Sequence, residues 1–304
     1  MENITPPLPP SASGESVVAG NPFQHAALLL DWSRSDFERR LGFSGGRFTT
    51  PNKVLAFIAA LLLTAAFYAL IVLSLRLWPQ THRYAAMFLE RGPCPYPTVL
   101  LFFWALSLLG IKWRKLRLQL RAMDLPIMPQ QPEFELTPDT ARSVRDRMRM
   151  MVDNPHHFIL LNRIDLALAN LHNIGHTADV AAILKIQAEN DEAQIASSYG
   201  LVNGFMWAIP VLGFIGTVLG LGQAIGAFGG TLDSGGDMAA LRGSLQMITS
   251  GLATAFDTTL IALVAALILQ ILVSFLQSRE SEFLDTCNDI CHKHVAGKLR
   301  LSSN

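Results

Sequence analysis

The sequence predicts an all-α integral membrane protein with four transmembrane helices and long helices that extend into the cytoplasm. Half of the 304 residues are hydrophobic and only 16% are charged, whereas soluble domains carry about 25% charged residues. The apolar residues are concentrated in four blocks, and no segment shows the alternating pattern of a strand. The net charge is zero, so the composition offers no field that would attract nucleic acid.

The residues before the first apolar block predict two segments. Residues 1–20 are rich in Pro, Ser and Gly and lack the charged-then-apolar layout of a signal peptide, which indicates a disordered leader. Residues 21–53 are expected to form a cytoplasmic N-terminal helix. The chain contains three cysteines, and their number and spacing do not indicate a disulfide framework.

Each of the four apolar blocks is predicted to cross a membrane. The first contains the uncharged stretch VLAFIAALLLTAAFYALIVLSL, which is long enough for the roughly 30 Å hydrocarbon core. The second is short, but Lys112 and Trp113 at its end can reach the interface. The last is interrupted by Asp257 and several threonines. The predicted spans are 54–78, 96–112, 201–228 and 245–276.

The distribution of Lys and Arg predicts that both termini lie in the cytoplasm. The second span is followed at once by the basic stretch KWRKLRLQLR, whereas the two short loops predicted outside hold only Arg83, Arg91 and Arg242. Positive residues remain preferentially on the cytoplasmic side. Residues 113–200 are therefore expected to form a cytoplasmic helical region, and residues 277–304 a cytoplasmic tail.

Helix signals divide the cytoplasmic region. Thr137 is a predicted N-cap with Pro138 in the first turn, and Asn154 followed by Pro155 is expected to open another helix. The stretch ADVAAILKIQAENDEAQIASSYG contains no strong helix breaker. Since the next proline is Pro210, the sequence predicts one long helix that runs from the cytoplasm into the third span.

The glycines of the third span predict close helix packing. They occur in PVLGFIGTVLGLGQAIGAF, which has neither the preceding strand nor the Lys-Ser/Thr pair of a phosphate-binding loop. Gly213, Gly216 and Gly220 fall on one helical stripe, and small residues let helices approach closely in lipid. The fourth span also carries small residues, which favours an oligomer packed around a shared axis.

Polar residues in the third and fourth spans are candidates for an ion path. Thr217, Thr254 and Asp257 are predicted to reach similar depth, and Thr254, Asp257 and Thr258 share one helical face. A carboxylate inside a membrane is costly and is therefore a functional candidate. The alternatives are that the threonines bond to carbonyls of their own helix and that Asp257 is a structural partner.

No other cluster indicates catalysis or a cofactor. His172 and His176 lack the accompanying carboxylate of a zinc protease. The C-terminal Cys and His residues are favoured as part of a plain amphipathic tail over a zinc site, because the usual Cys-x2-Cys spacing is missing. They are Cys287, Cys291, His292 and His294. The sequence therefore predicts no enzyme, no metal and no cofactor.

Two stretches resemble the MotA/TolQ/ExbB proton channel family. AIPVLGFIGTVLGLGQAI, residues 208–225, resembles the third-helix motif of that family, and SGLATAFDTTLIALVAAL, residues 250–267, resembles its last pore helix. By this resemblance, Thr217 and Thr254 match the pore-lining threonines of the TolQ/ExbB branch, and Pro210 matches the motif proline. The four-span topology resembles MotA, and Asp257 stands where TolQ and ExbB proteins typically have glycine.

The resemblance implies a function. Family members form a homopentamer around single-span helices of a MotB-, TolR- or ExbD-type partner that carries the essential aspartate. It implies an ion-conducting subunit, for protons or sodium ions, of a stator-like complex in the bacterial inner membrane that turns the ion-motive force into mechanical work. A non-conducting tetraspan scaffold is the alternative. An intramembrane enzyme using Asp257 ranks last, because such proteases usually need two carboxylates.

Overall fold

The computed structural model describes residues 48–78, 82–127, 135–170, 177–233 and 238–299, together with residues 30, 32, 38, 42 and 46. The predicted leader 1–20, as well as His172 and His176, lies outside the described residues. Of the predicted N-terminal helix, Trp32 and Glu38 are described as helical, and most of the remainder also lies outside.

The described parts of the chain are helical. Their β contacts are two isolated bridges, Leu30 with Val152 and Leu136 with Leu299. The helices are α3 (Lys53–Leu77), α4 (His82–Leu89), α5 (Pro95–Met123), α6 (Pro138–Met151), α7 (Ile159–Asn170), α8 (Thr177–Ser198), α9 (Gly200–Asp233) and α10 (Met238–Cys291), with a 3-10 turn at Pro155–His157 and a π turn at His292–Ala296.

Four helical stretches are long and apolar enough to cross a membrane. They are Lys53–Leu77, Pro95–Met123, Asp179–Gly229 and Leu241–Ala296. The all-helical fold with four membrane helices is therefore confirmed. The prediction succeeds because span-forming composition is a local property of the sequence.

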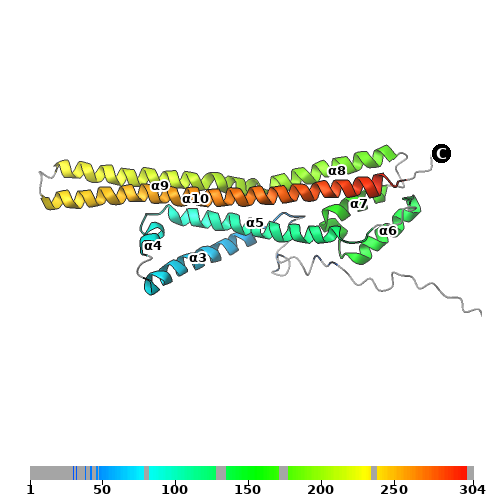
Figure 1. Ribbon diagram of the computed structural model, residues 1–304, viewed down its shortest axis with the longest axis horizontal. Coiled ribbons are helices and arrows are strands. Elements are labelled where there is room, and N and C mark those ends of the chain that lie inside the picture. The colour runs from blue at the N-terminus through cyan, green and yellow to red at the C-terminus, as the bar shows by residue number, and fades with distance from the viewer. Residues whose placement is uncertain are drawn as a thin grey trace, which may run out of the picture.

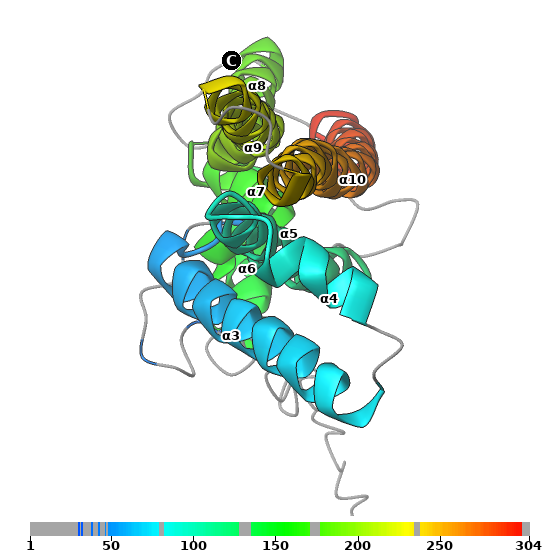
Figure 2. The same cartoon turned by 90° about the vertical axis from the view of Figure 1, so that its left-hand side faces the viewer.

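Helix α10 runs the length of the molecule, with α9 antiparallel along its N-terminal part and α8 beside its C-terminal part (Figure 1). Helix α5 lies along the middle of α10, and α3 packs on α5 on the side away from α9 (Figure 2). Helices α6, α7 and α8 gather beside the C-terminal part of α10, at the opposite end from the start of α10 (Figure 1).

The predicted helix from the cytoplasmic region into the third span is interrupted at Tyr199, between α8 and α9. The chain nevertheless continues as one helical stretch, Asp179–Gly229, so the expectation of one long helix is confirmed apart from this single turn residue. The hydroxyls of Ser197 and Ser198 donate to the carbonyls of Gln194 and Ile195. Such side-chain bonds compete with the helix, and the Gly200 that follows has low helix propensity.

A buried polar cluster surrounds this turn. The Tyr199 hydroxyl donates to Oε2 of Glu280 at 2.6 Å, and Lys112 Nζ donates to Oε1 of Glu280 at 2.9 Å. The side chains of Lys112 and Glu280 are 0% and 1% exposed. Lys112 also donates to the Ser198 hydroxyl at 2.9 Å. The cluster ties α5 and α10 to the junction of α8 and α9.

The predicted start of α6 is confirmed. Thr137 is its N-cap, and the Thr137 side chain accepts from the backbone of Thr140 while the Thr140 side chain accepts from the backbone of Thr137. Pro138 lies in the first turn, where its missing N–H leaves no helix hydrogen bond unmade.

Candidate functional site

The candidate site lies between α9 and α10, where several contact positions are glycine. Because glycine has no side chain, the two helices can approach closely there. A Cβ added to Gly213 would lie 2.6 Å from the Cβ of Ala262, and one added to Gly216 would collide with the side chain of Thr258. Both glycines are buried. The helices therefore touch along this stripe more closely than any larger residue would allow.

Gly220 and Gly251 make the contact reciprocal. A Cβ on Gly220 would lie 2.5 Å from the Gly251 carbonyl oxygen, and a Cβ on Gly251 would lie 2.5 Å from the Gly220 carbonyl oxygen. By contrast, a Cβ on Gly222 would meet no atom within 4 Å. The three stripe glycines predicted from spacing thus face α10, whereas Gly222 does not.

This close approach brings two hydroxyls together. Thr217 Oγ1 on α9 lies 2.5 Å from Thr259 Oγ1 on α10, and either group can be the donor. Thr217 Oγ1 is also 3.2 Å from the Ala255 carbonyl oxygen, and Thr259 Oγ1 is 3.1 Å from the Gly213 carbonyl oxygen. The pair is part-buried, and it forms a short polar chain across the interface.

Thr254 and Thr258 occupy a different environment. They are 8% and 3% exposed, and their hydroxyls donate to carbonyls of their own helix, those of Ser250 at 3.0 Å and Thr254 at 2.8 Å. Thr258 also packs against Gly216. Thr258 Oγ1 also lies 3.3 Å from the Ala255 carbonyl oxygen, which Thr217 contacts as well, so Thr258 is linked to Thr217 through that carbonyl rather than by a direct hydroxyl contact.

Asp257 pairs with a residue from another part of the fold. Its Oδ2 lies 2.7 Å from Nε of Arg91, which follows α4, and the two side chains are 22% and 21% exposed. Asp257 is two residues from Thr259, so the ion pair and the hydroxyl pair lie at a similar level on different faces of α10. Sequence reasoning counted Arg91 only as a loop charge, because the pairing of residues 166 apart has no local signal.

Pro210 lies inside α9, and the helix continues through it. A proline is tolerated within a membrane helix where neighbouring groups replace the missing hydrogen bond. Together with Trp207, Phe214 and Gln270, it borders an open hollow of about 660 Å³. The Trp207 side chain is 79% exposed, so this side of the α9–α10 hairpin presents a large apolar surface.

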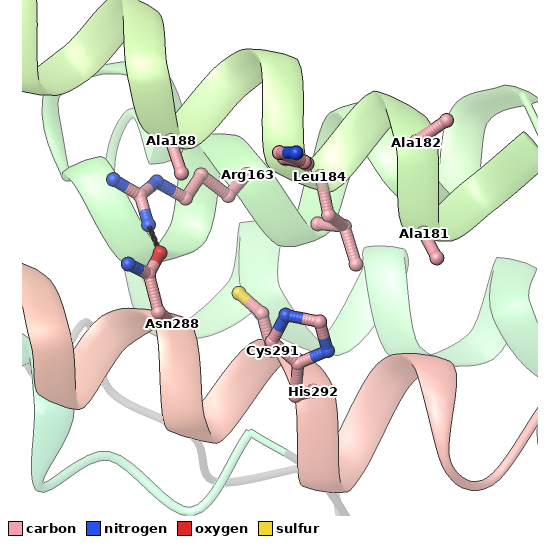
Figure 3. A pocket seen from close by; sticks show the side chains of 9 residues that line it. Arg163, Ala181, Ala182, Leu184, Ala188, Asn288, Cys291 and His292 are labelled. Carbon is pink, nitrogen blue, oxygen red and sulfur yellow. Dashed lines mark hydrogen bonds between the residues drawn. The ribbon is translucent and has the colours of Figure 1, made fainter.

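The C-terminal cysteines lie on α10 beside a hollow of about 350 Å³. Figure 3 shows Cys291 and His292 on one side of this hollow and Arg163 of α7 hydrogen-bonded to Asn288 on another. Burial raises the pKa of the Cys287 thiol to about 12 and that of Cys291 to about 11, although Arg163 acts in the opposite direction. Among the described residues, no group of three His, Cys, Asp or Glu side chains could hold a metal ion.

The fold and site define a multi-pass helical membrane protein whose last two membrane helices pack through glycine and share a hydroxyl pair. Residues 153–288 match the model of the MotA/TolQ/ExbB proton channel family. The resemblance predicted from the sequence is thereby confirmed for this segment, which runs from the residues before α7 into the C-terminal part of α10. No curated protein and no solved structure matches the chain.

Proposed function

We propose that this protein is the ion-conducting subunit of an energy-transducing complex in the bacterial inner membrane. Protons or sodium ions would flow along its α9 and α10 helices, and a partner subunit of the MotB, TolR or ExbD type would convert that flow into mechanical work. The family match over α9 and α10 supports this function, and the glycine contact specifies which two helices would carry it.

The observation that carries the proposal is the 2.5 Å contact between the Thr217 and Thr259 hydroxyls. A hydroxyl both donates and accepts, so the pair can exchange hydrogen bonds with a carboxylate of the partner as that group gains and loses a proton. An ion that moves through 100 mV releases about 2.3 kcal/mol, which is enough for a conformational step without covalent chemistry.

The exposed faces of α9 and α10 support an oligomer. In their most apolar windows, only 28% and 22% of the residues are buried inside one chain. Large side chains such as Phe214 and Phe256, which are 66% and 68% exposed, remain for lipid, for further copies of the chain or for the partner. We propose a homopentamer with both termini in the cytoplasm, in which these faces enclose the partner's single span.

Ion flux in proteoliposomes tests this function. The protein is reconstituted together with its single-span partner, and flux is driven by an imposed potential. We expect flux with the intact partner and none when the partner's membrane aspartate is changed to asparagine. If the complex assembles but both partner forms give only the leak of empty liposomes, ion conduction is contradicted.

Specific contacts favour a second candidate, the non-conducting tetraspan scaffold. Thr254 and Thr258 bond to their own helix, and Asp257 is neutralised by Arg91, so these three polar groups have structural partners. The scaffold predicts a stable oligomer without flux under any partner condition. The same reconstitution therefore separates the two functions.

A further inference from the structure

Two aromatic rings and two arginines meet where α5 and α10 leave the apolar part of the fold. The Trp113 ring of α5 and the Phe275 ring of α10 lie 5.6 Å apart. Arg117, four residues after Trp113, places its Cζ 5.0 Å from the Trp113 ring centroid. Arg279, four residues after Phe275, places its Cζ 5.5 Å from the Phe275 ring centroid. We call these four residues the arginine–aromatic surface.

Both arginines turn toward the apolar spans. Side chains of a helix tilt toward its N-terminus, and in α5 and α10 that direction leads back to the uncharged residues 95–111 and 258–278. The guanidinium of Arg117 lies over Trp113, and that of Arg279 lies over Phe275. Each ring belongs to the same helix as its arginine and stands one turn before it, so the two contacts show this tilt. The positive charges are thus held at the level where a membrane helix meets the headgroup layer, and Trp is typical of that level.

The surface keeps a positive charge after the neighbouring ion pairs are counted. Lys112 is buried against Glu280, and Lys115 is buried against Glu38, so these lysines are neutralised inside the fold. Arg117 is exposed. Arg279 is 53% exposed and donates to Oε2 of Glu282 at 3.1 Å, a carboxylate that is itself 67% exposed and contributes little in water.

An apolar track continues from the rings along α10. Phe275 is 51% exposed, and the residues one and two turns toward the span are exposed as well. They are Ile268 at 43%, Ile271 at 61% and Leu272 at 37%. A ligand that reaches the two guanidinium groups can therefore lay a hydrocarbon chain against α10 without leaving the membrane.

The geometry points to a binding site for an anionic phospholipid at the arginine–aromatic surface, in the leaflet on the side of α6, α7 and α8. The lipid phosphate lies between Arg117 and Arg279, and an acyl chain follows the exposed face of α10 past Phe275. A free phosphate ion could contact the two guanidinium groups but could not cover the exposed apolar residues of α10. A phospholipid can do both, and we therefore assign the site to a phospholipid. This site is separate from the Thr217–Thr259 pair and does not depend on ion conduction.

Native mass spectrometry of the purified full-length protein tests the site with phosphatidylglycerol and phosphatidylcholine. An arginine near a charged membrane surface raises the affinity about fivefold. The double variant Arg117→Gln with Arg279→Gln is therefore expected to lower the affinity for phosphatidylglycerol about thirtyfold. The matched control, Arg142→Gln with Arg149→Gln, removes two exposed charges from α6 and is expected to leave binding unchanged. Equal affinity for the two lipids, or a double variant within twofold of the wild-type affinity, would overturn the proposal.

Two further measurements on the wild-type chain distinguish the sources of the phosphate and do not rely on a variant. Soluble glycerol phosphate is expected not to displace phosphatidylglycerol, and displacement at equal concentration would contradict the lipid assignment. A photoactivatable phosphatidylglycerol in reconstituted membranes is expected to label the peptides that carry Trp113 and Phe275. Labelling confined to other peptides would exclude the site.

Discussion

The Oδ2 atom of Asp257 on α10 lies 2.7 Å from Nε of Arg91, which follows α4. This ion pair connects the short helix between the first two spans to the helix that carries Thr259. Asp257 therefore has a structural partner within its own chain, whereas the Thr217–Thr259 pair crosses the α9–α10 interface itself.

Removing either member of the Arg91–Asp257 pair is expected to destabilise the protein while leaving assembly intact. Both side chains are about one fifth exposed, so we expect Asp257→Asn and Arg91→Gln each to cost about 1 kcal/mol, with a coupling of similar size in the double variant. Thermal unfolding in detergent, run as a double-mutant cycle, measures the coupling. Additive effects would show that the pair makes no net contribution, and dissociated subunits would show that assembly requires it.

The close contact between Gly220 and Gly251 gives a prediction, and Gly222 on the same helix provides its control. Gly220→Ala places a Cβ 2.5 Å from the Gly251 carbonyl oxygen, so the helices must separate, and we expect a loss of about 1–3 kcal/mol. Gly222→Ala adds the same methyl group on the same helix where no atom lies within 4 Å, and should be neutral. Unfolding of the two variants in one detergent makes the comparison. Equal stability of both would contradict the close approach.

Breaking the buried Lys112–Glu280 pair is expected to destabilise the protein strongly. Lys112→Met leaves Glu280 buried without its cation, and breaking such a pair costs about 3–5 kcal/mol, while Lys112→Met with Glu280→Leu should recover much of the loss. The exposed pair of Lys293 and Asp289, with side chains 73% and 74% exposed, provides the control. Lys293→Met should not change the unfolding temperature. A Lys112→Met variant as stable as wild type would argue against the buried cluster.

The cysteine pKa values predict a pH dependence. Because folding raises the thiol pKa of Cys287 and Cys291 above the ordinary value of 9.0, to about 12 and 11, the folded state favours the protonated thiols. Their contribution to the unfolding free energy is complete below about pH 9 and is lost as pH rises toward 11. We expect both thiols to resist maleimide at pH 8 in the folded protein and to react after unfolding in detergent. The double Cys→Ala variant should lose less stability between pH 9 and 11, and an equal loss would contradict the assignment.

The sequence predicts the helices of this protein better than it predicts their contacts. The four spans follow from uncharged runs, and the start of α6 follows from Thr137 and Pro138, because both signals are local. The partner of Asp257 is Arg91, and that of Thr217 is Thr259. Each partner depends on how distant helices are aligned in space, which spacing along one helix does not specify. The hydrogen bond of Tyr199 likewise goes to Glu280, 81 residues away.

The most direct test of the central claim is proton flux through proteoliposomes that contain Thr217→Val together with the partner subunit. Thr249→Val is the matched control, because Thr249 lies on α10 and its hydroxyl donates to the Leu245 carbonyl of its own helix. If the Thr217–Thr259 hydroxyl pair carries the ion, Thr217→Val assembles normally and reduces flux at least tenfold, which corresponds to about 1.4 kcal/mol, while Thr249→Val conducts as wild type. Equal flux through both variants would contradict the account.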